Sequence, residues 1–228
     1  MAYRKTAAVV QRLADKRRLI IRAVRQVVAE VGFRDAQITM VVAASGISTG
    51  TVYRHFGSKA ELYAEAVSVN SQYELDILLA IANSDGPAVD RIEDAIRVFA
   101  SRALRVKRLA WAMIAEPVDA EVDVARMKYR RAYGDMFRDL IEEGIAAGDL
   151  PPQNSAASAA CFFGALIEGL IGPLAPGAAR PTEESRLIDA IVMFCLRAIG
   201  TSPSNPLAQV GDKYGTVVPF SPGEDPTT

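Results

Sequence analysis

The chain has 228 residues, of which 50% are hydrophobic and 23% are charged, so it is long enough to bury a core and too apolar to be disordered throughout. Two cysteines exclude a disulfide-built scaffold and favour a reducing compartment, and the single histidine, His55, excludes a His-rich metal site. Up to residue 65 the chain carries eleven Lys and Arg against five Asp and Glu, and beyond it 15 against 22. A basic segment joined to an acidic one indicates a polyanion-binding module attached to a second unit.

Signals that would direct the chain to a membrane are weak. The first eighteen residues are rich in Arg and Lys and lack the apolar run of a secretory signal. Residues 156–175 are apolar, but Ser158, Glu168 and Pro173 interrupt them, and Ala and Gly predominate over Leu. We therefore expect a buried helix there, a cytoplasmic protein and no membrane partner.

Helical periodicity runs along most of the chain, whereas alternating strand patterns and hairpin turns do not occur. Gly32 and Gly46 are placed to end the first two helices, the former as a left-handed residue. Thr39 is the expected N-cap of the second helix, and Ser58 with Glu61 forms a capping box at the start of the fourth. The predicted helices, in chain order, are 15–31, 39–45, 49–55, 59–81, 89–106, 108–115, 120–147, 155–172 and 183–199.

These elements predict an all-α protein with four parts. Residues 1–14 form a basic flexible arm, and 15–63 form a helix-turn-helix domain, which the fourth helix, from 59 on, links to the rest. Residues 64–200 form a helical bundle for ligand binding and dimerisation. Residues 201–228 hold five prolines and no helical pattern, which predicts a tail.

The two short helices around a Gly-containing turn read as a helix-turn-helix. Apolar side chains can pack these helices on each other and on the first helix: Val42, Ala43, Ile47, Val52 and Phe56. The remaining positions of the second short helix are hydrogen-bonding, cationic or very small: Ser48, Thr49, Gly50, Thr51, Tyr53, Arg54 and His55. Such a face suits phosphates and base edges rather than a protein core.

The run Gly-Thr-Val-Tyr-Arg-His-Phe over 50–56, with Lys59 three residues on, resembles the DNA-binding domain of TetR-family transcriptional regulators. The resemblance covers about residues 16–63, and its departures from the usual pattern, Ser45 and Ile47, are mild. It implies an all-α homodimer that binds a double-stranded DNA operator through this domain and a small-molecule effector through the other.

The resemblance also implies roles for single residues. Ser48, Thr49, Gly50 and Thr51 would meet base edges in the major groove, and Arg54 would reach either phosphate or base. The expected phosphate contacts are Thr39, Tyr53, His55 and Lys59, the last helped by the helix N-terminus on which it lies.

Structural roles remain open for the same residues. Tyr53 could be half-buried between helices, His55 could be packed or merely solvent-facing, and Lys59 could be an ordinary solvated lysine. The basic residues of the first eighteen positions could touch DNA or only solubilise the chain.

Two later helices, 155–172 and 183–199, are nearly apolar all round, and small residues recur every four positions in the first. Small residues allow another helix to approach closely, so both helices predict a four-helix dimer interface. A monomeric core that uses the same residues is the alternative. The interface residues that we expect are Ala160, Gly164, Ile167, Ile188, Ile191 and Cys195.

The bundle also offers bulky residues for an effector cavity, although such residues at helical spacing also suit a plain core. Arg130 could receive an anionic group of the effector. The candidates are Trp111, Met113, Met127, Arg130, Tyr133, Phe137, Phe162, Phe163 and Leu166.

No catalytic constellation, metal-ligand spacing or phosphate-binding loop is visible, so we expect no enzyme activity, no metal and no cofactor. The sequence predicts a repressor that a small, largely apolar effector releases from a palindromic operator. The alternative is a small-molecule-binding interaction protein without sequence-specific DNA binding, but loss of the polar recognition face would be its signature, and that face is intact.

Overall fold

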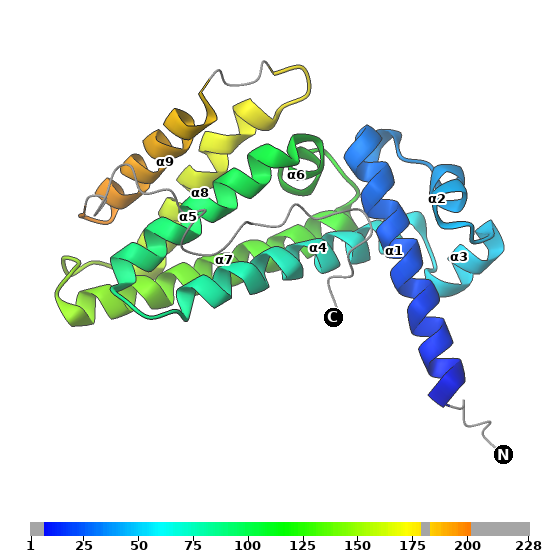
Figure 1. Ribbon diagram of the computed structural model, residues 1–228, viewed down its shortest axis with the longest axis horizontal. Helices are drawn as coiled ribbons and strands as arrows, with labels where there is room; N and C mark the ends of the chain where they lie inside the picture. The colour runs from blue at the N-terminus through cyan, green and yellow to red at the C-terminus, as the bar shows by residue number, and fades with distance from the viewer. Residues whose placement is uncertain (1–6, 179–182, 202–228) are drawn as a thin grey trace.

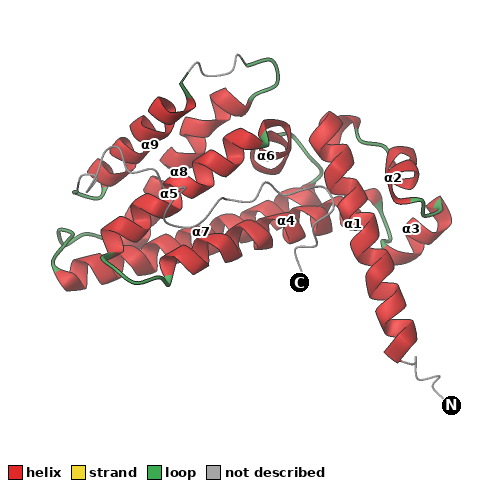
Figure 2. Ribbon diagram, viewed as in Figure 1, coloured by secondary structure: helices red, strands yellow, loops and turns green. Residues whose placement is uncertain are grey.

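The computed structural model describes residues 7–178 and 183–201, and within these ranges every regular element is an α-helix (Figure 1; Figure 2). The all-α prediction is confirmed. The helices are α1 (Ala7–Asp35), α2 (Ile38–Ser45), α3 (Thr49–His55), α4 (Lys59–Ala82), α5 (Ala88–Arg105), α6 (Lys107–Ile114), α7 (Ala120–Ala147), α8 (Ser155–Leu174) and α9 (Glu184–Ala198).

The largest difference from the predicted bounds is at the start of the chain. Helix α1 begins at Ala7 rather than at 15, so residues 7–14, which we expected in a flexible arm, are helical. The remaining residues of that arm, 1–6, and residues 202–228 of the predicted Pro-rich tail lie outside the described residues. The prediction missed this helical extension because it does not contribute to the core: residues 8–13 are exposed, including the apolar Val9, Val10 and Leu13.

Two local expectations near the helix-turn-helix need correction. Regular helical geometry breaks at Gly32 with a positive φ, as expected, but with φ 81° and ψ 176° the residue is not in the left-handed helical conformation, and α1 continues across this kink to Asp35. Only glycine adopts that backbone without strain, and a Cβ there would collide with the side chains of Arg108 and Glu116. Thr39 is not an N-cap, because α2 already begins at Ile38 and Gln37 precedes it.

The helices form two parts joined by one continuous helix (Figure 1). Helices α1 to α3 lie at one end, and α4 runs from them along the length of the molecule beside α7. Helices α5 and α6 continue the bundle, and α8 and α9 lie as a pair on the side away from α4. A displacement of α4 in one part of the molecule can therefore be transmitted directly to the other part.

Two apolar cores correspond to these parts. The C-terminal core is built from α5, α7, α8, α9 and the second half of α4, with Ile96, Phe137 and Leu166 fully buried. The N-terminal core is built mainly from α1 to α3 and the first half of α4, with contributions from α6 and α7, and it includes Leu62 and Val67. It therefore extends past the boundary at 63 that we predicted between the domains.

Helix α8 is the one described helix long and apolar enough to suit a membrane span. One of its faces carries Phe162, Leu166 and Leu170, each almost completely buried in the C-terminal core. Helices of this composition are common inside water-soluble bundles, and burial of this face in the core explains why the residues of α8 are apolar.

Candidate DNA-binding surface and effector cavity

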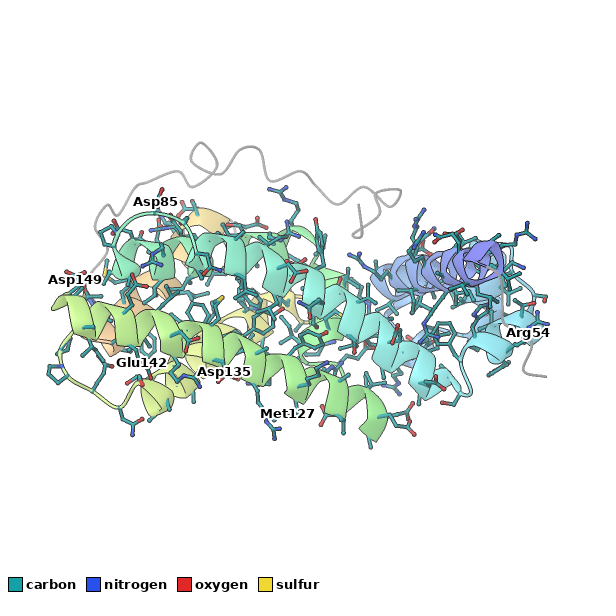
Figure 3. The ribbon with its side chains drawn as sticks, turned by 90° about the horizontal axis from the view of Figure 1, so that it is seen from below. Arg54, Asp85, Met127, Asp135, Glu142 and Asp149 are labelled. Atoms are coloured by element: carbon teal, nitrogen blue, oxygen red, sulfur yellow. The ribbon has the colours of Figure 1, made fainter. Side chains whose placement is uncertain are left out.

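Helix α3 divides into a buried and an exposed face, as the sequence predicts. Val52 and Phe56 are 1% exposed and belong to the N-terminal core. Ser48, Thr49, Gly50 and Arg54 are exposed, and Tyr53 is 46% exposed, so a large part of the Tyr53 side chain is accessible. Figure 3 shows Arg54 at the end of the molecule away from the bundle. The polar face of α3 is therefore accessible to a partner.

The other DNA-binding candidates border this face. Thr39 is exposed on α2, and Thr51, His55 and Lys59 are partly exposed. Within the surface, the Ser48 hydroxyl lies 3.1 Å from that of Thr51, which also accepts a hydrogen bond from Arg54 at 2.9 Å. The predicted set thus lies together at the surface, although Ala43, which we expected to pack, is exposed, and Val41 is buried instead.

The side chains of Ser58 and Glu61 cap the start of α4, as the sequence predicts, although Glu61 accepts from the Gly57 amide rather than from that of Ser58. The Glu61 amide donates to Ser58 Oγ at 2.9 Å, and the Gly57 amide donates to Glu61 Oε2 at 2.7 Å. Lys59 lies in this first turn, where its Nζ is 5.1 Å from the centre of the Tyr63 ring. The cap holds Lys59 beside α3. The free backbone N–H groups at the N-terminus of α4 add a partial positive charge there.

Cations surround His55. Arg17 of α1 donates to the His55 carbonyl at 3.0 Å, and its guanidinium lies 4.3 Å from the centre of the Phe56 ring. Partial burial, followed by the charges of Arg17, Arg54 and Lys16, lowers the pKa of His55 below its ordinary value. The same positive potential that disfavours a protonated imidazole attracts phosphate groups.

A cavity of about 600 Å³ lies between α1 and the C-terminal bundle, with walls from α4, α5, α6, α7 and α8. Its volume falls in the usual range for small-molecule sites, about 300–1,000 Å³. Five of the predicted effector residues line it: Met113, Met127, Arg130, Tyr133 and Phe163. Figure 3 shows Met127 on the side of α7 away from α4, and it is 47% exposed, so it belongs to the rim.

Four predicted effector residues do not line this cavity. Phe137, Phe162 and Leu166 are at most 1% exposed, and the rings of the first two pack with their centres 4.7 Å apart. Trp111 instead lines a second hollow at the junction with the DNA-binding helices, beside Phe33 and Tyr63. Helical spacing alone cannot distinguish a core-filling aromatic side chain from one at a cavity wall.

The inner wall of the cavity is aromatic. The Tyr133 ring stacks on Phe163, with centres 5.2 Å apart, and meets Phe99 edge-on at 5.8 Å. The Tyr133 hydroxyl donates to the Ser71 carbonyl of α4 at 3.0 Å, and burial raises the pKa of this phenol. These contacts hold the aromatic side chains of the wall in place, where an apolar ligand can contact them.

Sequence reasoning missed the polar residues of the cavity. Arg22 and Arg25 come from α1, Asn70 from α4, and Arg102 from α5, where Glu74 accepts two hydrogen bonds from it at 2.6 and 2.9 Å. These residues lie far apart in the chain, and only tertiary packing brings α1 against the bundle. A local sequence signal for them does not exist.

Glu116, between α6 and α7, joins the bundle to the DNA-binding helices. Its carboxylate is 6% exposed and accepts hydrogen bonds from the amides of Phe33, at 2.9 Å, and Arg34, at 3.4 Å. Arg126 donates to the Glu116 carbonyl at 2.7 Å, and Arg108 donates to the Val31 carbonyl. Polar contacts therefore connect the cavity wall to the segment that leads into α2.

The predicted interface residues do not share one surface. Ile167, Ile191 and Cys195 are at most 7% exposed and pack in the C-terminal core, so their assignment to an interface with another chain is wrong. Ala160 is exposed, and Gly164 and Ile188 are partly exposed. A Cβ added at Gly164 would meet nothing within 4 Å, and Phe194 of α9 is 62% exposed. The helices are amphipathic after all, and only their outer faces remain for another chain.

An exposed polar helix-turn-helix, joined through a continuous helix to a bundle with a cavity, defines the class of DNA-binding regulators with a separate ligand-binding domain. Residues 20–66 match the family model for bacterial regulatory proteins of the tetR family, and residues 85–168 match the model for the tetracyclin repressor-like C-terminal domain. The chain belongs to the TetR family of transcriptional regulators, which are not enzymes.

Solved structures share this fold at low sequence identity. FadR from Bacillus subtilis, in complex with stearoyl-CoA, is 17% identical with a TM-score of 0.70, over 79% of this chain and 98% of that chain. TylP from Streptomyces fradiae is 20% identical with a TM-score of 0.62, over 85% and 89%. RolR in complex with resorcinol is 18% identical with a TM-score of 0.63, over 88% and 99%. No curated protein sequence matches the chain significantly.

Proposed function

We propose that the protein is a cytoplasmic homodimeric repressor, and that a small, largely apolar effector releases it from a palindromic operator. The observation that carries this proposal is the cavity of about 600 Å³ shared by α1 and the bundle. A molecule bound there contacts the DNA-binding part and the effector part together. FadR and RolR, which share the fold, each bind a small molecule, and this supports an effector for the present protein.

The exposed face of α3 supports DNA binding over the alternative of an interaction protein without it. In this proposal Ser48, Thr49, Gly50 and Thr51 meet base edges, and Thr39, Tyr53, His55 and Lys59 hold phosphates, with Arg54 at their border. The two recognition helices of a dimer enter successive major grooves about 34 Å apart, which requires a near-palindromic operator.

The dimer is proposed to form through the outer faces of α8 and α9. Ala160, Gly164 and Ile188 lie at the surface of these helices, and Phe194 adds a large exposed apolar side chain. Exposed apolar area of this kind, on two adjacent helices that present small residues, suits a second copy of the same pair.

The DNA assignment is tested by Lys59→Ala, with Lys128→Ala as the matched control. Both lysines lie about 5 Å from a tyrosine ring, but Lys128 is on α7 in the bundle. Operator DNA is taken from the region next to the gene, and affinity is measured by fluorescence anisotropy against salt concentration. Lys59→Ala is expected to weaken binding to every sequence and to lower the salt slope by about one per chain, with Lys128→Ala unchanged.

Equal affinity and equal salt slope for Lys59→Ala and the unmodified protein would refute the phosphate contact. The effector part is tested separately by linkage. A ligand that weakens DNA binding tenfold must itself bind the DNA complex tenfold more weakly, a coupling of about 1.4 kcal/mol. If a ligand binds in the cavity but leaves the affinity for operator DNA unchanged, that ligand is not an effector.

A further inference from the structure

The wall of the effector cavity carries much more positive than negative charge. Eight Lys and Arg side chains line it, against three carboxylates. Beyond residue 65, by contrast, the chain has 15 basic and 22 acidic residues. The positive excess is therefore particular to the cavity and opposite in sign to the domain that provides most of its wall.

Carboxylates compensate only some of these cations. Glu74 accepts two hydrogen bonds from Arg102, Glu184 lies 3.7 Å from Lys107, and Glu116 lies 3.8 Å from Arg108. Within residues 7–178 and 183–201, no carboxylate forms an ion pair with Arg22, Arg126 or Arg130, all three of which line the cavity. A cationic wall with an apolar interior focuses positive potential into the cavity.

Arg126 is the most informative of these three cations. Its two terminal nitrogens donate only to backbone carbonyls, those of Ala112 and Glu116, and its buried Nε has no hydrogen-bond partner among the described residues. Burial lowers the pKa of this guanidinium, although Asp123 and Glu116 oppose that effect from a distance. Keeping a cation in such a place costs free energy that an anion in the cavity would offset.

The remaining wall is apolar. Phe99, Tyr133 and Phe163 form an aromatic cluster, and Ile167 and Met113 extend it. One cavity thus combines an apolar surface suited to a hydrocarbon chain with cations suited to a charged group.

We propose that the effector is an anionic amphiphile, whose apolar chain packs on Phe99, Tyr133 and Phe163 and whose carboxylate or phosphate group is bound electrostatically by Arg126. Arg22 and Arg130 add positive charge from α1 and α7. This inference rests on the proposed function, since it specifies the molecule that the same cavity binds. It differs from the expectation that the anionic group lies near Arg130, because Arg130 is exposed to screening solvent whereas Arg126 is partly buried.

The test uses three probes with the same ten-carbon chain: decanol, decanoate and decyl phosphate. Their affinities for the full-length protein are measured by isothermal titration calorimetry. Decanoate or decyl phosphate is expected to bind about 10-fold or more tightly than decanol, in line with a charge-assisted interaction. The ratio between the two anions distinguishes a carboxylate effector from a phosphate effector.

Variants locate the charge effect. In Arg126→Gln the advantage of the anion over decanol is expected to shrink to about threefold or less, while decanol itself binds as before. Arg131→Gln is the matched control, because Arg131 is exposed on the same helix and does not line the cavity. Should Arg126→Gln fail to fold, Arg130→Gln provides a second, exposed position, with a smaller expected loss.

Equal affinity of decanol and both anions for the unmodified protein would overturn the inference and leave an uncharged apolar effector in place. An anion preference that survives unchanged in Arg126→Gln, or is lost equally in Arg131→Gln, would overturn the role of Arg126. Absence of binding by all three probes would overturn the inference as well. Operator release is measured with the same probes, so an anion that binds without releasing DNA would contradict the proposed function alone.

Discussion

The carboxylate of Glu116 is expected to be a main polar link between the bundle and the DNA-binding helices. Glu116→Ala removes the acceptor of the Phe33 amide, 2.9 Å away, and the weaker one of the Arg34 amide, 3.4 Å away, at a position where the carboxylate is only 6% exposed. Leaving a buried donor without its charged acceptor costs about 1–3 kcal/mol. We therefore expect the free energy of unfolding to fall by about 2 kcal/mol.

In a chain of this length, about 2 kcal/mol corresponds to a decrease in melting temperature of roughly 4–8 °C. The measurement is thermal unfolding at one fixed protein concentration, since a dimer unfolds in a concentration-dependent way. Glu121→Ala is the control, because Glu121 is an exposed carboxylate a few residues further on. If the two variants melt within about 1 °C of the unmodified protein, the Glu116 contacts do not stabilise the junction and the reasoning is wrong.

Three further predictions concern the DNA-binding surface, the dimer and the core. A phosphate next to His55 would raise the pKa that partial burial and neighbouring cations lower in the free protein, so DNA binding takes up protons and should strengthen from about pH 8 to about pH 6; an equal pH slope in His55→Gln would contradict this contact. Gly164→Arg should give a folded monomer in analytical ultracentrifugation, because the site is open within the chain, whereas Gly134→Arg, equally open on α7, should remain dimeric; a dimeric Gly164→Arg would place the interface elsewhere. Burial raises the pKa of the Cys195 thiol to about 12, so alkylation followed by mass spectrometry should modify it only in denaturant, and rapid reaction in folded protein would exclude the buried position.

Sequence patterns predicted the elements well where the local signal is strong. The pattern of Ser58 and Glu61 correctly predicted the first residue of α4. The polar residues of α3 lie on the surface because Val52 and Phe56, on the opposite face of the same segment, are buried in the core. The N-cap at Thr39 failed because a hydroxyl before an apolar run is common inside helices as well.

Cavity and interface residues were predicted less well for a physical reason. Phe162 and Phe163 are adjacent in sequence and equally apolar, yet one fills the core against Phe137 and the other lines the cavity. Likewise, Ile191 and Phe194 are both on α9, but one is 7% and the other 62% exposed. The direction of a side chain relative to its neighbours depends on how helices pack, and periodicity determines that direction only approximately.

The composition of the N-terminal core has a consequence for exchanging domains between regulators. Leu109, Ala112 and Met113 of α6, together with Val122 of α7, complete that core, although they lie within the segment matched to the C-terminal family model. A chimera cut between residues 66 and 85 would therefore separate the DNA-binding helices from part of their own interior and expose it to water. A chimera that preserves both halves must therefore keep α6 and the start of α7 compatible with α1.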